Sequence, residues 1–345
     1  MQIIRKTIRV IDYEKNEIHE IAPPDSFSQY IEQLISHINE NKSVREYKTR
    51  SVNTEVISCI LSILEDKVDE DSYNSKINSI AKRLSTKEAE AQKSIWSLGT
   101  NVQKGSLVQA LLYDEVEQRR TYLLAKVEHV DFVDDYDFSF KSGFSKDKKT
   151  LWKSCLFDVS EEDAKEFQAR VYSNNIAKYW WDGFLELEPL KGDELNTITA
   201  FKKIEGTLNR MIKRESPRDH MIIKNAVASY FKSNDHIDYE LMIKQSIESY
   251  KPIELTSEKM KTLIDRVKEL PEKYEFDRQF TSVSDSINIQ IKKVYDVYPG
   301  VQVRIIDAID DIPNTIQAYR EPDGNRYIKI KTDNEDTYRI FEKQL

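Results

Sequence analysis

The sequence contains few of the residues on which the commonest binding and catalytic motifs depend. Only 8 of its 345 residues are glycine, whereas glycine makes up about 7% of an average protein. This scarcity disfavours glycine-rich phosphate-binding loops, and no P-loop, GxGxxG, HExxH or GxSxG motif occurs. The two cysteines and five scattered histidines exclude a disulfide scaffold, a zinc ribbon and a c-type haem site.

Long apolar runs are also missing. No stretch of about 18 apolar residues is present, which predicts that no helix spans a membrane. Residues 1–9 lack the apolar block of a secretory signal peptide, so we expect a cytoplasmic protein by elimination. Charged residues make up 32% of the chain and aromatic residues 10%, with a formal net charge of -8. Such a composition is typical of a folded globular protein with substantial cores.

Hydrophobic periodicity predicts an α+β protein with three parts. Residues 1–160 are expected to form an N-terminal domain in which helices pack on an antiparallel sheet. Residues 161–284 are predicted to be helical, because prolines punctuate a series of segments with helical spacing. Residues 285–345 are predicted to form a small C-terminal β module, with a turn at Pro322–Asn325.

The individual elements follow from the same patterns. Ser26 and Gln29 are spaced as in a capping box, which predicts a helix start after Ser26. The N-terminal domain is then expected to contain a hairpin over 2–21, a strand at 44–50, two helices between 56 and 96, a hairpin of 106–113 with 121–130, and strands near 132–144 and 151–159. The predicted helices of the middle region are 161–173, 175–187, 192–214, 217–233, 238–249 and 256–269. The predicted C-terminal strands are 287–294, 301–306, 315–320 and 326–331.

Two basic stretches stand out in this acidic chain. Lys141–Lys153 carries five lysines and one aspartate with aromatic residues among them, and Arg210–Lys224 carries five basic and two acidic residues around Pro217. Lysine beside aromatic groups suits nucleic-acid phosphates and bases, and a basic helix start suits phosphates. An ordinary solvated face is the alternative for each stretch. The candidate DNA-binding residues are Lys141, Lys146, Lys148, Lys149, Lys153, Arg210, Lys213, Arg214, Arg218 and Lys224.

Other candidate groups give weaker signals. The carboxylates Asp131, Asp134, Asp135 and Asp137 could hold a divalent cation, as in a metal-dependent nuclease, or could form a solvated acidic loop. Cys59, Cys155 and the aromatic segment around Trp180 lie among apolar residues and are predicted to be buried, the last in the core or a dimer interface. We therefore identify no catalytic residue, metal ligand or cofactor.

The order of the segments resembles the bacterial nucleoid-associated protein family of the NdpA type, the 37-kD nucleoid-associated proteins. The resemblance rests on Gly105–Tyr113 with Tyr122–Val127, on the strand end at Leu156–Val159 followed by Tyr179–Leu185, and on the C-terminal strands. It implies a non-enzymatic protein that associates with the bacterial chromosome and binds DNA or DNA-bound proteins. The family has no catalytic signature, so the resemblance supplies no site residue.

Together these observations predict a homodimer that binds double-stranded DNA in the nucleoid, largely without sequence specificity, through local basic surfaces. Two alternatives stay open. The first is a protein-interaction subunit of an anti-phage defence or nucleoid complex, in which contact with DNA is indirect. The second is a metal-dependent nuclease that uses the carboxylates between Asp131 and Asp137.

Overall fold

The computed structural model describes residues 1–64, 69–96, 99, 101–133, 136–144, 152–159, 167–173, 177–287, 293–306, 309 and 311–342. The chain divides into two compact units, Met1–Gly192 and Asp193–Leu345. Helices and antiparallel strands occur in both units, which confirms the α+β prediction. The predicted boundaries after residues 160 and 284 differ from this division.

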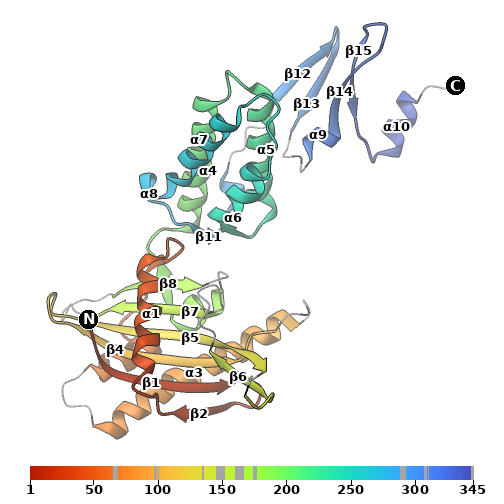
Figure 1. Ribbon diagram of the computed structural model, residues 1–345. Helices are drawn as coiled ribbons and strands as arrows, with labels where there is room; N and C mark the ends of the chain where they lie inside the picture. The colour runs from red at the N-terminus through yellow and green to blue at the C-terminus, as the bar shows by residue number, and fades with distance from the viewer. Residues whose placement is uncertain are drawn as a thin grey trace. The chain divides into compact units, whose positions relative to one another are not determined.

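The first unit is built on a nine-stranded sheet with antiparallel pairings throughout its described part (Figure 1). Its strands are β1 (Gln2–Asp12), β2 (Glu17–Ile21), β3 (Arg45–Thr49), β4 (Gly105–Asp114), β5 (Arg119–Val133), β6 (Phe140–Phe144), β7 (Trp152–Asp158), β8 (Gln168–Ser173) and β9 (Leu187–Pro189). Their order is β2-β1-β4-β5-β7-β8-β3-β9, and β6 pairs with β5. The two predicted hairpins, β1–β2 and β4–β5, are confirmed.

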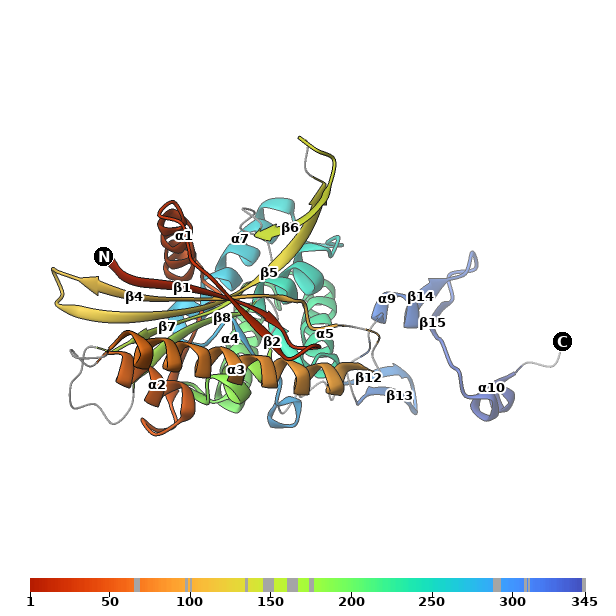
Figure 2. The same cartoon turned by 90° about the horizontal axis from the view of Figure 1, so that it is seen from below.

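Helices cover both faces of this sheet, with α1 (Phe27–Glu40) on one face and α3 (Glu70–Ile95) on the other (Figure 2). The shorter α2 (Glu55–Ile63) packs on α3. Residues of β5 alternate between the two layers: Leu123 belongs to the core under α1 and Leu124 to the core under α2 and α3. Because both faces are buried, apolar residues follow one another in the central runs Ala110–Leu112 of β4 and Tyr122–Ala125 of β5. Helix α1 begins where predicted, but the Ser26 side chain makes no capping hydrogen bond.

Residues 168–173 form the strand β8, so the helix predicted at 161–173 is wrong over these residues. The reason is tertiary pairing, since β8 lies between β7 and β3. Residues 160–166 lie outside the described part of the chain. In place of the helix predicted at 175–187, the structure has a short π-helical segment, η2 (Tyr179–Phe184), followed by β9. Residues 174–176 lie outside the residues that the structure describes. Trp180 and Phe184 of η2 are buried, which confirms the predicted aromatic core.

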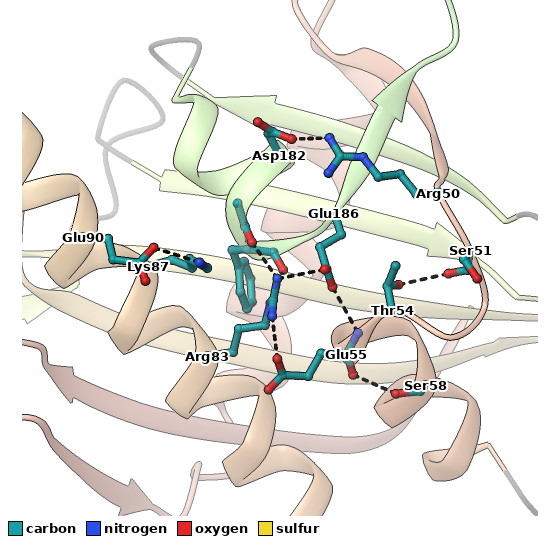
Figure 3. A network of polar contacts seen from close by, with 12 residues as sticks. Arg50, Ser51, Thr54, Glu55, Ser58, Arg83, Lys87, Glu90, Asp182 and Glu186 are labelled. Atoms are coloured by element: carbon teal, nitrogen blue, oxygen red, sulfur yellow. Dashed lines mark hydrogen bonds and ion pairs between the residues drawn. The ribbon is translucent and has the colours of Figure 1, made fainter.

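A network of hydrogen bonds and ion pairs connects η2 to α2 and α3 (Figure 3). The guanidinium of Arg83 donates hydrogen bonds to the carbonyls of Gly183 and Phe184, at 2.8 and 2.9 Å. The same guanidinium forms ion pairs with Glu55 and with Glu186. Glu186 also accepts the backbone N–H of Glu55, at 3.0 Å, and so caps the first turn of α2. A single arginine therefore connects three elements that are distant in sequence.

The second unit begins with a helical layer around one core that includes Phe201, Phe231 and Phe280. Its elements are α4 (Asp193–Met211), α5 (Pro217–Ser233), β10 (His236–Asp238), α6 (Tyr239–Ile243), a π-helical segment η3 (Lys244–Glu248), α7 (Ser257–Lys268), α8 (Leu270–Tyr274), β11 (Gln279–Thr281) and a 3-10 turn η4 (Ser284–Ser286). The helices predicted at 192–214, 217–233 and 256–269 are confirmed. The one predicted at 238–249 is divided into α6 and η3.

Two hairpins and two short helices complete the second unit. They are β12 (Lys293–Tyr298) with β13 (Val301–Ile305), α9 (Ile312–Thr315), β14 (Ile316–Arg320) with β15 (Arg326–Ile330), and α10 (Glu335–Phe341). The predicted turn at Pro322–Asn325 joins β14 to β15, and Gly324 has a φ of 92° there. The strand predicted at 287–294 instead begins at Lys293 in the part that the structure describes.

Candidate nucleic-acid interface

The connection between α4 and α5 presents four exposed basic side chains, which we call the basic turn: Arg210, Lys213, Arg214 and Arg218. Among the residues that the structure describes, none of these side chains takes part in an ion pair or a hydrogen bond. All four belong to the second basic stretch found in the sequence. An unneutralised group of this kind can attract a polyanion locally, even on a chain whose formal net charge is -8.

The helical repeat explains why these side chains face solvent. Ile204, Leu208 and Ile212 are buried and follow one another at four-residue spacing along α4 and its end. This spacing places one stripe of the helix on the core. Arg210 lies between Leu208 and Ile212, Lys213 follows Ile212, and both side chains are exposed to solvent. Burial of the apolar stripe thus determines the exposed face of the basic turn.

Asp219, next to Arg218 in the first turn of α5, connects the basic turn to residues 250–255 through hydrogen bonds that we call the Asp219 anchor. Its buried carboxylate accepts hydrogen bonds from the Tyr250 hydroxyl at 2.6 Å and from three consecutive backbone N–H groups of Ile253, Glu254 and Leu255, at 2.8, 2.8 and 2.7 Å. Burial by itself would raise the pKa of Asp219, but these hydrogen bonds lower it below its ordinary value. The ionised carboxylate therefore holds the first turn of α5 against the segment before α7.

Acidic side chains neutralise the surroundings of the basic turn only in part. Glu215 lies within it but forms an ion pair with Lys259. Lys224, the last residue of the basic stretch, pairs with Glu205 at 2.5 Å and is 19% exposed. Lys224 is thus already neutralised by a neighbour, which corrects its prediction as an available DNA contact.

The first basic stretch, Lys141–Lys153, forms no basic surface in the part of the chain that the structure describes. Lys146, Lys148 and Lys149 lie outside the described residues, and for Lys141 the structure describes only the backbone, on β6 opposite Phe132. Lys153 is buried on β7 and forms an ion pair with Glu128 at 2.9 Å. The prediction of Lys153 as a DNA contact is therefore corrected. The reason is that β7 is a central strand between β5 and β8 and is covered on both faces.

Lys153 belongs to a buried charged cluster that sequence reasoning missed. The cluster contains Glu88 of α3, Lys126 and Glu128 of β5 and Lys153 of β7, and the ring of Tyr179 lies 5.8 Å from the Lys153 ammonium. Burial raises the pKa of Glu88 and lowers the pKa of Lys126. The signal in the sequence was the position of Lys126 and Glu128 directly after the apolar run Tyr122–Ala125.

The acidic segment gives no metal site in the described part of the chain. Asp131 is exposed, Asp137 accepts hydrogen bonds from the backbone and hydroxyl of Ser139, and Asp134 and Asp135 are not described. No group of three or more histidines, cysteines, aspartates or glutamates suitable for a metal occurs among the described residues. Within the same ranges, no helix is long and apolar enough to cross a membrane.

Comparisons with known proteins give no match to a family model, to a curated protein or to a solved structure. The resemblance to the nucleoid-associated family therefore stays a prediction. The functional argument depends on the residues of this chain alone.

Proposed function

We propose that this protein binds the phosphate backbone of double-stranded DNA through the basic turn, with little sequence preference. The observation that carries the proposal is the group of four exposed cationic side chains at the junction of α4 and α5, which form no ion pair with any residue in the described ranges. Arginine can bind a phosphate with two parallel hydrogen bonds, and each neutralised phosphate releases condensed counterions. Such contacts hold the duplex without reading its bases.

The chemistry of the turn favours a duplex over an unpaired strand. No aromatic residue occurs between Arg210 and Arg218, so the turn itself offers no ring on which an unpaired base can stack. The Asp219 anchor fixes the start of α5 and limits the freedom of the adjoining Arg218. A fixed group of cations loses less conformational entropy when it binds phosphates.

The proposal is tested by a mobility-shift titration on a random-sequence duplex at about 50 and 200 mM salt, with and without magnesium. We expect a shift that weakens steeply at the higher salt concentration. The Lys213→Ala/Arg214→Ala variant should bind more weakly, and its logarithmic salt slope should fall by about 2 if both residues contact phosphates.

The matched control is Lys15→Ala/Lys82→Ala, which removes the same charge from two exposed positions of the first unit. It should bind as the unchanged protein does. Equal affinity of the basic-turn variant and this control would contradict the proposed interface. Magnesium-dependent cleavage of the duplex would instead favour the nuclease alternative.

A second candidate function, association with another protein, is favoured by the β5–β6 hairpin. Tyr136, Phe138 and Phe140 are 92%, 78% and 87% exposed, and exposed apolar groups of this kind mark contact surfaces. The partner to test first is a second copy of the chain, because we expect a homodimer. Sedimentation should then give a dimer for the unchanged protein and a monomer for Phe138→Ser/Phe140→Ser. A monomer in both cases would contradict self-association through this hairpin.

A further inference from the structure

A cleft of about 390 Å³ opens in the first unit between β1, the end of β2 and the first turn of α3. The residues that matter for its chemistry are Arg5, Thr7 and Arg9 of β1, Glu20 of β2, and Glu70 and Tyr73 of α3. This cleft and the basic turn belong to different units. Its chemistry is therefore independent of the proposed DNA contact.

The strand repeat brings the polar groups of β1 together. Arg5, Thr7 and Arg9 occupy alternate positions, so their side chains leave the same face of the strand. Strand β2 pairs with β1 only from Ile8 to Asp12. The residues around Thr7 therefore lie beyond the end of β2, where the cleft opens.

Two buried polar atoms in the cleft lack a hydrogen-bond partner in the described structure. Arg9 is 1% exposed; its Nε donates to Asn78 at 2.7 Å and its Nη1 donates to the carbonyl of Ile8 at 3.2 Å. Its Nη2 makes no hydrogen bond. The Oγ1 of Thr7, a residue 9% exposed, also has none. Within the described ranges, Thr7 Oγ1 is therefore a buried group without a partner, which is unfavourable, whereas Arg9 Nη2 has only its ion pair with Glu20. An incoming anion could accept from both atoms.

The carboxylates beside these groups are largely exposed. Glu20 lies 3.2 Å from Arg9 Nη2, and Glu70 lies 3.2 Å from Arg5 Nη1, but the two carboxylate side chains are 60% and 70% exposed. The Arg5–Glu70 pair is open to solvent on both sides and contributes little, whereas in the other pair the Arg9 guanidinium is buried. Because both carboxylates are mostly exposed, either can turn to solvent when another anion takes its place.

Two further residues, Lys6 and Tyr73, line the cleft beside the arginines. Lys6 also lines the cleft, but its ammonium already donates to the carbonyls of Pro24 and Asp25 and to the hydroxyl of Ser28. The Arg5 guanidinium lies over the ring of Tyr73, with its Cζ 4.2 Å from the ring centroid. The two arginines are thus the cations best placed to accept a new anionic partner.

We propose that this cleft binds a phosphate monoester. The phosphoryl oxygens take the places of Glu20 and Glu70 on the guanidiniums of Arg9 and Arg5 and accept the hydroxyl hydrogen of Thr7. A phosphate suits this site because its several oxygens can satisfy the two arginines and the hydroxyl at once. The rest of a small ester occupies the remainder of the cleft beside Tyr73.

Calorimetric titration with adenosine monophosphate tests the site, with adenosine as the probe that lacks the phosphate. We expect binding of the first and not of the second. Thr7→Val, which keeps the side-chain shape, and Arg5→Gln should each weaken binding by about tenfold or more. Glu20→Gln should strengthen binding, since it removes a competing carboxylate. Thermal unfolding of each variant identifies any that fails to fold.

The outcomes separate the proposal from a purely structural role of these residues. The site would be overturned if adenosine monophosphate bound neither the unchanged protein nor Glu20→Gln. It would also be overturned if adenosine bound as tightly as adenosine monophosphate. Unchanged affinity in folded Thr7→Val would overturn it as well. A 5′-phosphorylated oligonucleotide that binds more tightly than the mononucleotide, and than its 5′-hydroxyl counterpart, would identify a nucleic-acid end as the source of the phosphate. Equal binding of the two phosphorylated probes would identify a free small ester.

Discussion

The ammonium of Lys126 and the carboxylate of Glu88 form an ion pair in which the two side chains are 1% and 0% exposed. Lys126 also donates a hydrogen bond to the carbonyl of Gln103 at 2.6 Å. Moving either charge out of water is costly, and each is tolerated because the other is present. The pair thus connects α3 to the centre of the sheet through electrostatics inside an apolar core.

Replacing one member of this pair should be more harmful than replacing both. Lys126→Met leaves the Glu88 carboxylate buried without its partner, so we expect a loss of about 3–5 kcal/mol in the free energy of unfolding. The double variant Lys126→Met/Glu88→Met should recover most of this loss. Denaturant unfolding of both variants checks the prediction, and equal losses would show that the two charges do not depend on each other.

The Asp219 anchor should be equally sensitive to substitution. In Asp219→Asn, an amide replaces a carboxylate that accepts four hydrogen bonds. We expect a loss of about 3 kcal/mol at neutral pH, because three backbone N–H groups and the Tyr250 hydroxyl lose a charged acceptor. Asp235→Asn, at an exposed position of the same unit, is the control and should change stability by less than about 0.5 kcal/mol. Urea unfolding measures both, and similar losses would contradict the anchor.

The same residue should make stability depend on pH. Hydrogen bonds keep the pKa of folded Asp219 low despite its burial, whereas an unfolded aspartate has a pKa of about 3.9. Ionised Asp219 thus adds stability above about pH 4, and this contribution is lost as pH falls through the folded pKa. The stability difference between the unchanged protein and Asp219→Asn should therefore be largest near neutrality and shrink in acid. A difference that stays constant down to about pH 2 would exclude this linkage.

Two glycines should respond to alanine in opposite directions. At Gly105, a Cβ would lie 2.3 Å from the carbonyl oxygen of Val127, so β4 or β5 would have to shift. We expect Gly105→Ala to cost about 2–3 kcal/mol. At Gly206, within α4, nothing lies within 4 Å of such an atom, and Gly206→Ala should stabilise by about 0.5–1 kcal/mol. Thermal unfolding gives both signs, and destabilisation by Gly206→Ala would contradict the open space at that site.

Arg83 should be the critical residue of the network in Figure 3. Its guanidinium is largely buried, so Arg83→Met leaves the carbonyls of Gly183 and Phe184 without their donor. We expect a loss of about 2–4 kcal/mol. Lys87→Met removes only the side-chain pair with Glu90 and should cost less than about 0.5 kcal/mol. Hydrogen exchange around η2 should rise in the first variant alone, and an equal rise in both would contradict this assignment.

Local patterns predicted much of the fold. The β4–β5 hairpin combines apolar strands with a charged turn, and α5 begins at a proline, so both could be located without tertiary information. Residues 168–173 could not be placed in this way. Their strand is formed through pairing with β7 and β3, which lie elsewhere in the sequence. Tertiary pairing can override local preference in such segments.

The candidate site was predictable only in part for a related reason. The sequence identified the basic turn because its residues are close along the chain. It could not distinguish exposed Lys213 from buried Lys153, since burial depends on strands that cover β7. The cleft between β1 and α3 was invisible at that stage, because Arg9 and Glu70 come together only in the folded unit.

The position of β3 between β8 and β9 also constrains how the first unit is made. Residues 45–49 leave the ribosome long before residues 168–189, which supply both neighbours of β3. Until then, β3 has two unpaired edges, and the chain must keep them from other strands. Closing such distant pairs is slow, since the entropy of a long loop is lost before the contacts form. The first unit should therefore complete its sheet only after its last strand has been synthesised, and nascent chains that stop before it should be prone to aggregation.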